Sequence, residues 1–357
     1  VNGSWRFEQI GQSWLKHGFT ALTQNLCGSC DGTGGPVLGI NCSDPYVASL
    51  NGGQSRLGPK WQVNATTGLY NYPFAGQGAT VGNNVDRRLL VRKSDVDPAQ
   101  NAGARYVVEG QYVTRDDAGY GNGANSASIR EVLMSSGATP INLTAAAAGS
   151  AVQSLTLNCS TYRREPGIKA WKALDPQVTL VAAEYTAPVA YVPPTSPPSG
   201  DNNSGANYLT PPTSTVVRFW VAARVTDNGN GTWHYEYAIQ NINSDRAARS
   251  FGFDMNPLLD PVNVGFSAPF YHSGEVQNNL PWGGSKATGM FRWSTNAYTG
   301  VTATDNATNA LRWGTMYNYR FDLPAAPVTG TAKLYLFKPG TANEPTLLKI
   351  AGLPVPP

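Results

Sequence analysis

The feature that most constrains the fold is a pair of alternating segments near the middle of the chain, Val216–Thr226 and Trp233–Ile242. The odd-numbered residues are apolar or aromatic from 217 to 225 and from 233 to 239, while the even-numbered residues include the charged and most polar side chains. A period of two residues is typical of antiparallel strands that bury one face. Glycine and asparagine at 228–231 favour the backbone conformations of a tight connection. The sequence therefore predicts a β-hairpin at 216–242.

The alternation also predicts which residues face each other, because a slip of one residue would expose one apolar set to water. Opposed residues must share parity, so we expect Val225 to lie opposite Trp233. On the other face Arg224 then lies opposite His234, with Glu236 as its diagonal neighbour. A cross-strand polar cluster explains these three side chains without a catalytic role.

Parity places Trp220 on the same polar face of the hairpin, between Arg218 and Ala222. A large aromatic side chain among such neighbours is not expected to stay exposed to water. Another part of the chain is the preferred cover, and a second subunit or a sugar are the alternatives. Trp220 is therefore a candidate contact surface.

The rest of the chain reads as short strands separated by turns, which favours a mostly β fold with two antiparallel β-sandwich-like domains. Apolar residues recur at helical spacing in residues 6–26, which predicts one N-terminal helix. Residues 28–84 read as long ordered loops, and the C-terminal Leu353–Pro357 reads as an extended tail. The other expected strands are Arg88–Arg92, Arg105–Val113, Ser128–Met134, Ser154–Cys159, Val178–Tyr185, Ser250–Met255, Val262–Phe266, Gly289–Trp293, Met316–Asp322 and Ala332–Lys338.

Composition indicates an exterior protein. Charged residues make up 14% of the chain, below the roughly 25% usual for soluble proteins. Polarity comes instead from uncharged side chains, with 38 Gly and 26 Pro. The net charge is +3 and Lys and Arg are scattered, so nucleic acid is not an expected partner. No apolar run approaches the roughly 20 residues of a membrane span.

The four cysteines also fit an oxidising compartment: an even number predicts two disulfides. We expect Cys159 to pair with Cys30 or Cys42, because a long closed loop would tie the N-terminal segment to the sheet. A zinc site is the first alternative, although no second Cys-x-x-Cys is present. A redox pair of Cys27 and Cys30 is the second, although it would need a βαβ context.

Two groups of side chains are candidate metal ligands. His272 and Glu275 lie three residues apart in one segment and could serve a transition metal or a general base. A Gly-rich loop offers oxygen ligands for calcium, although its spacing is not that of an EF-hand and a solvated hairpin loop is the preferred explanation. No hydrolase, metalloprotease or nucleotide-binding motif occurs, and no organic cofactor is indicated. The calcium candidates are Asp116, Asp117, Asn122 and Asn125.

Seven segments spread over nearly the whole chain carry a resemblance to known proteins: Arg6–Phe19, Cys42–Tyr46, Trp233–Tyr237, Asn243–Arg246, Tyr271–Gly274, Leu311–Thr315 and Phe337–Gly340. They resemble a family of uncharacterised secreted bacterial proteins to which no activity is assigned. The resemblance implies a piece of chain upstream of Val1, so we expect a processed or trimmed product. It also implies a shorter connection in the family where this chain has a Pro-rich segment at 186–215. That favours an inserted arm over a domain linker.

With 357 residues the chain is long enough for two domains. We place them at residues 1–166, a helix with a disulfide-linked, loop-rich β domain, and residues 167–357, a β-sandwich carrying the arm. The preferred function is an extracellular structural or self-assembling protein, such as a surface, sheath or filament subunit, with copies of itself as partners. A secreted carbohydrate-binding or glycan-active protein is the alternative, and a metal-dependent secreted enzyme the third.

Overall fold

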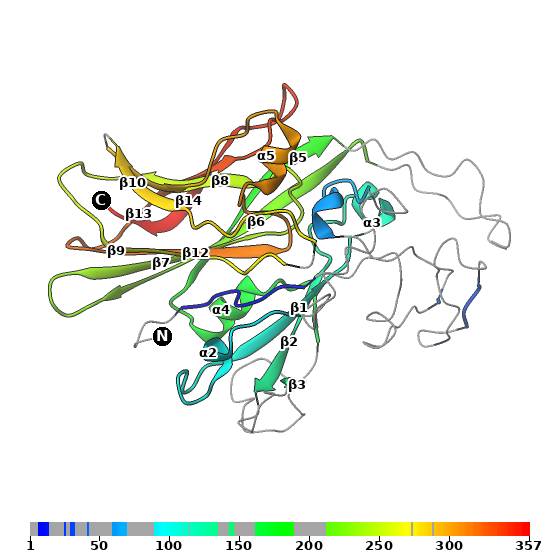
Figure 1. The fold of residues 1–357 in the computed structure, drawn as a ribbon, viewed down its shortest axis with the longest axis horizontal. Helices are drawn as coiled ribbons and strands as arrows, with labels where there is room; N and C mark the ends of the chain where they lie inside the picture. The colour runs from blue at the N-terminus through cyan, green and yellow to red at the C-terminus, as the bar shows by residue number, and fades with distance from the viewer. Residues whose placement is uncertain are drawn as a thin grey trace.

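The computed structural model describes residues 6–13, 25, 29–32, 41–42, 59–69, 89–113, 115–134, 143–145, 161–188, 212–272, 274–287 and 289–357. Two five-stranded antiparallel sheets pack face to face (Figure 1). The prediction of a mostly β, sandwich-like fold is confirmed. The first sheet, called the β7 sheet here, has the order β5 (Thr179–Pro188), β6 (Ser214–Asp227), β7 (Trp233–Asn241), β12 (Thr315–Leu323) and β9 (Val262–Ser267). The second, the β8 sheet, has the order β10 (Gly283–Ala287), β11 (Met290–Ser294), β8 (Ala248–Asp254), β13 (Val328–Leu336) and β14 (Leu347–Val355).

Aromatic side chains fill the space between the two sheets. Tyr237 of β7 contacts Phe251 and Phe253 of β8, with ring centroids 5.4 and 5.3 Å apart. All three side chains are fully buried. The Tyr237 hydroxyl still finds a partner, because it donates a hydrogen bond to the carbonyl of Pro354 at 2.8 Å. Aromatic burial of this kind contributes most of the apolar area that stabilises a sandwich core.

The hairpin forms as predicted, but its register is shifted by two residues. Trp233 lies opposite Asp227, not Val225, and Arg224 lies opposite Glu236. Parity is preserved, so the apolar faces still match. The difference arises in the turn, where the Asn228 N–H donates to the Thr232 carbonyl at 2.9 Å and closes a shorter loop. Turn geometry, and not only the buried face, therefore determines the register.

The outer face of the β7 sheet, which carries Trp220, is covered as well. Residues 6–13 and the helix α4 (Ile168–Leu174) lie against it, on the side away from the β8 sheet (Figure 1). The predicted helix at 6–26 is wrong for residues 6–13, which form no helix, and 14–24 lie outside the described residues. This segment is held by β12 instead. The Asn318 side chain donates to the Phe7 carbonyl at 2.7 Å, and the Met316 N–H donates to Gln9 Oε1 at 2.6 Å.

A smaller sheet lies beyond this cover (Figure 1). Its β2 pairs with three neighbours, and the short helices lie around it and beside the sandwich. The predicted strand at Arg88–Arg92 is wrong for residues 89–92, which form no strand. Residue 88 and the predicted strand Ser154–Cys159 lie outside the described residues. The elements are β1 (Tyr106–Gln111), β2 (Ala127–Met134), β3 (Leu143–Ala145), β4 (Tyr162–Arg163), η1 (Lys60–Gln62), α2 (Lys93–Val96), α3 (Arg115–Gly119) and α5 (Thr302–Ala307).

Two segments differ from their expected roles. The C-terminal tail is not free, because β14 pairs with β13 along its length and buries Leu353 and Val355 in the core. In the Pro-rich region, β5 and β6 pair from Thr179 to Pro188, so the chain between them joins two neighbouring strands of one sheet. Residues 189–211 themselves lie outside the described residues. The division of the chain into two domains stays a prediction.

Candidate functional site

The calcium candidates fall in and after α3. Asp116 and Asp117 belong to the helix, and Asn122 and Asn125 follow in two turns, where the Asn122 N–H donates to the Asp117 carbonyl at 2.9 Å. Burial raises the pKa of Asp117, which opposes the ionised state that calcium requires. In the described part of the chain, no three His, Cys, Asp or Glu side chains gather where they could hold a metal ion. Calcium binding stays a prediction.

His272 and Glu275 hold two segments of the chain to the sandwich. His272 Nε2 donates to the Gln12 carbonyl at 2.7 Å. The Glu275 carboxylate accepts the backbone N–H groups of Lys60 at 2.6 Å and Trp61 at 3.1 Å. Glu275 thereby satisfies donors at the start of η1 that have no partner within the helix. Sequence proximity predicted a shared ligand role for the pair, whereas the structure turns the two side chains toward different backbone groups.

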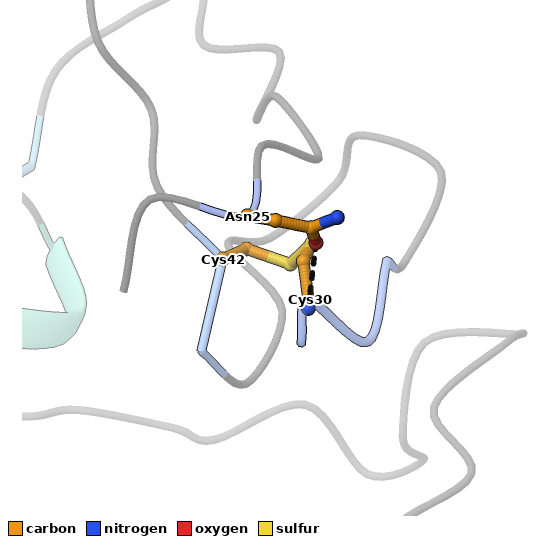
Figure 2. The surroundings of a disulfide bond; sticks show 3 residues. All are labelled: Asn25, Cys30 and Cys42. Atoms are coloured by element: carbon orange, nitrogen blue, oxygen red, sulfur yellow. Dashed lines mark hydrogen bonds between the residues drawn. A yellow bond between two sulfur atoms is a disulfide. The ribbon is translucent and has the colours of Figure 1, made fainter. Parts of the chain in front are cut away.

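The structure joins Cys30 to Cys42 in a disulfide (Figure 2). This pairing excludes the expected bond from either residue to Cys159. The two cysteines are 12 residues apart, so the bond closes a short local loop and does not tie the segment to a distant strand. The Cys30 N–H also donates to Asn25 Oδ1 at 2.9 Å. Cys27 and Cys159 lie outside the described residues.

Trp220 is covered in part by the chain itself. Its ring packs at the edge of an apolar cluster that includes Ile168 and Trp171 of α4. Lys169 Nζ lies 4.9 Å and the Arg218 guanidinium 5.6 Å from the ring centroid, so two cations approach its electron-rich face. Part of the cover is therefore intramolecular, and a role of Trp220 as a contact surface stays a prediction. The covering element is a helix that the sequence analysis did not predict.

A polar cluster around His234 forms on the outer face of the β7 sheet, but its members differ from the predicted Arg224, His234 and Glu236. His234 lies between two carboxylates, with Nδ1 2.6 Å from Asp322 Oδ1 and Nε2 3.2 Å from Glu236 Oε2. Hydrogen bonding to Glu236 raises the pKa of His234, and burial raises the pKa of Glu236. Arg224 is not a member, because its Nε bonds to Asp175 Oδ2 at 2.9 Å. Glu236 is only 1% exposed, so this arrangement stabilises the fold and offers little access to a substrate.

A pocket of about 350 Å³ opens where the segments Asn243–Arg246 and Phe337–Gly340 meet. The first segment follows β7 and the second follows β13. The end of β5 and the Asn64–Thr67 turn complete the wall. The lining residues are Asn64, Thr66, Thr67, Tyr185, Ala187, Pro188, Asp245, Arg246, Pro339, Gly340, Thr341 and Glu344.

Arg246 is the central side chain of the pocket. Its Nε donates to the Lys338 carbonyl at 3.0 Å and its Nη1 to the Pro345 carbonyl at 2.8 Å. Its guanidinium lies 5.5 Å from the Tyr185 ring centroid. Glu344 Oε1 is 3.7 Å from Nη1, while Nη2 is buried and has no hydrogen-bond partner among the described residues. A buried guanidinium group therefore keeps one donor side unused.

The rest of the pocket lining is mixed in charge and rich in hydroxyl groups. Asp245 Oδ2 pairs with Lys338 Nζ at 2.9 Å, which leaves the other carboxylate oxygen without a hydrogen bond from the described residues. Thr66 Oγ1 donates to the Asn243 carbonyl at 2.8 Å. Glu344 Oε2 accepts both the N–H and the hydroxyl of Thr341, at 2.8 and 3.0 Å. Such an array can bind a polar ligand by paired donors and acceptors, and it holds no evident nucleophile.

Sequence reasoning did not identify this pocket, because its walls come from four segments far apart in the chain. The available signal was the presence of charged residues next to Pro and Gly within two of the resembling segments.

No helix among the described residues has the length and apolar character needed to cross a membrane. No protein-family model matches the chain, and no curated protein matches it.

Proposed function

We propose that this chain is an extracellular structural protein that assembles with copies of itself, as a surface, sheath or filament subunit. The carrying observation is that both sheets end in an unpaired strand on the same side of the sandwich. In the described part of the chain, β9 pairs only with β12 and β10 pairs only with β11. At the opposite edges of the two sheets β14 packs against β5 more extensively than β10 packs against β9.

The exposed residues at this open side support a contact with another copy. Val262 and Val264 of β9 are 52% and 41% exposed. Every residue of β10 is exposed. Unpaired edge strands present free N–H and C=O groups that readily pair with a second chain. Low charge density, which lowers repulsion between copies, also favours assembly.

Light scattering and electron microscopy of the full chain at increasing concentration test this proposal. We expect oligomers or filaments that Val264→Lys disrupts, because a charge on an edge strand opposes pairing. Val216→Lys is the matched control, since Val216 is similarly exposed, at 37%, but lies in β6, which already has two neighbours. A strict monomer at high concentration would contradict the proposal.

A glycan-binding protein is the second candidate, and the Arg246 pocket favours it. Sugar hydroxyl groups donate and accept together, which suits a guanidinium beside partly unused carboxylates such as those of Asp245 and Glu344. Isothermal titration with neutral and acidic oligosaccharides tests this function. We expect binding that Glu344→Gln weakens and that Glu165→Gln, which changes a carboxylate outside the pocket lining, leaves unchanged. A panel without any binder would exclude this candidate.

A further inference from the structure

We propose that the Arg246 pocket binds a sugar that carries a free amino group, and that it prefers this sugar to acidic and N-acetylated sugars. This selectivity rests on the glycan-binding function proposed above and names the class of sugar. The pocket volume of about 350 Å³ lies in the range of roughly 300–1,000 Å³ that is usual for small-molecule sites. The preference for an amine follows from which charged atoms of the lining can contact a ligand.

The positive charge of Arg246 is turned toward the protein. Its Nε and Nη1 donate to the carbonyls of Lys338 and Pro345, at 3.0 and 2.8 Å, and Nη1 also faces Glu344 Oε1 at 3.7 Å. The remaining nitrogen, Nη2, is buried, so a ligand in the pocket does not reach it. An anionic ligand therefore cannot form the paired hydrogen bonds with which an arginine normally binds a carboxylate.

Two carboxylates of the lining each keep one oxygen atom for a ligand. Asp245 Oδ2 pairs with Lys338 Nζ at 2.9 Å, while Oδ1 accepts no hydrogen bond from the described residues. Glu344 Oε2 accepts the N–H and the hydroxyl of Thr341. Its Oε1 accepts no hydrogen bond within the part of the chain that the structure describes, although the side chain is only 8% exposed. A carboxylate oxygen binds an ammonium group more strongly than a neutral hydroxyl group.

The Asn64–Thr67 turn supplies uncharged donors for the rest of a sugar ring. Asn64 Oδ1 accepts the backbone N–H groups of Thr66 and Thr67, at 3.0 and 3.1 Å. These bonds fix the amide group, whose Nδ2 donates no hydrogen bond to the described residues. The Thr67 hydroxyl oxygen accepts the Leu69 N–H at 3.3 Å and can donate its own hydrogen. Hydroxyl and ring oxygens of a sugar accept hydrogen bonds from such groups, so an amino sugar fits both walls.

The charge of the whole chain does not produce this preference. The net charge is +3, which repels a cationic ligand at long range. A preference for an amino sugar must therefore come from the local carboxylates of Asp245 and Glu344. N-acetylation removes the positive charge of the ligand, and a uronic acid brings a further carboxylate close to these two. Both changes therefore weaken binding.

Isothermal titration of the full chain tests the selectivity with a glucosamine trimer, the same trimer in N-acetylated form and a uronic acid trimer, at about pH 6, where a free amine is ionised. We expect the glucosamine trimer to bind at least about tenfold more tightly than the acetylated trimer, and the uronic acid trimer to show no measurable binding. Glu344→Gln and Asp245→Asn should each reduce this preference, because each removes one charge and keeps the shape of the side chain. Glu165→Gln, which changes a carboxylate outside the lining, is the matched control and should keep the full preference.

The comparison of ligands on the parent chain does not depend on the stability of any variant. Equal binding of the glucosamine and acetylated trimers would overturn the preference for an amine and leave glycan binding intact, whereas no binding of any sugar would contradict the glycan-binding function itself. Trilysine, which carries amines without sugar oxygens, should bind less tightly than the glucosamine trimer, and equal binding would overturn the assignment to a sugar. A preference that persists in both Glu344→Gln and Asp245→Asn would show that the amino sugar binds elsewhere.

Discussion

Gln240 Nε2 donates a hydrogen bond of 2.6 Å to Glu109 Oε2, and this contact joins the sandwich to the smaller sheet. Gln240 lies on the outer face of β7, and Glu109 lies on β1. The Gln240 oxygen accepts the Ile168 N–H at 3.0 Å, so the same side chain also holds the start of α4. Three parts of the fold therefore meet at one amide group that is 4% exposed.

Replacement of Gln240 by Leu should destabilise the fold strongly. The change leaves the Ile168 N–H buried without its partner, at a cost of roughly 1–3 kcal/mol, and it removes one of the two hydrogen bonds to Glu109 Oε2, which keeps the Gly167 N–H. We expect the free energy of unfolding in urea to fall by about 2–4 kcal/mol. Gln177→Leu is the matched control, because Gln177 is exposed and should shift the value by less than about 0.5 kcal/mol.

The alternation of residues 216–242 was sufficient to predict a hairpin and its buried face, because side-chain parity follows directly from strand geometry. It could not fix the register, which depends on the hydrogen bond between Asn228 and Thr232 in the turn. It also missed the cover on the outer face. Residues such as Gln240 look solvated in the sequence and become buried only through contacts with segments more than 70 residues away.

The Arg246 pocket could not be predicted from the sequence for the same reason, because its walls come from distant segments. Arg246 and Glu344 are unremarkable loop residues in the sequence, and their proximity depends on the pairing of β13 with β8 and β14. The cysteine pairing was missed for a different reason. A preference for a long closed loop favoured Cys159, whereas the local chain path brings Cys30 and Cys42 together.

The His234 cluster predicts a pH dependence of stability. The folded pKa of His234 is raised above its ordinary 6.5 by Glu236 and Asp322, so the folded state binds the proton more tightly than the unfolded state. The stabilisation is complete below the unfolded pKa and is lost as the pH rises through the folded pKa. We expect the difference in urea midpoint between the parent chain and His234→Gln to be largest near pH 5.5 and to shrink above neutral pH.

A difference that is constant from pH 5.5 to 8.5 would contradict this interpretation. His272→Gln is the control, because His272 lies outside the His234 cluster and holds the segment 6–13 through a hydrogen bond to the Gln12 carbonyl. Its effect should reflect the loss of a hydrogen bond and should not follow the titration of His234.

Gly340 should be required for the shape of the Arg246 pocket. A Cβ at this position would lie 2.6 Å from Arg246 Nη1 and 2.8 Å from Glu344 Cβ, closer than these atoms can approach. We expect Gly340→Ala to lower the melting temperature, at a cost of about 1–3 kcal/mol, and to weaken any ligand binding in the pocket. Gly283→Ala is the matched control, since a Cβ there meets no atom within 4 Å, and it should leave both properties unchanged.

The burial of β14 predicts that the C-terminal strand belongs to the stable core and is not a free arm. Leu353 is fully buried in the core between the sheets, whereas Leu258 is 86% exposed. Leu353→Ala should therefore lower the free energy of unfolding by about 2–5 kcal/mol, because it removes apolar contacts and leaves a cavity. Leu258→Ala makes the same chemical change and should cost less than about 0.5 kcal/mol. Equal, small effects of the two substitutions in urea unfolding would mean that the C-terminal strand is not part of the stable core.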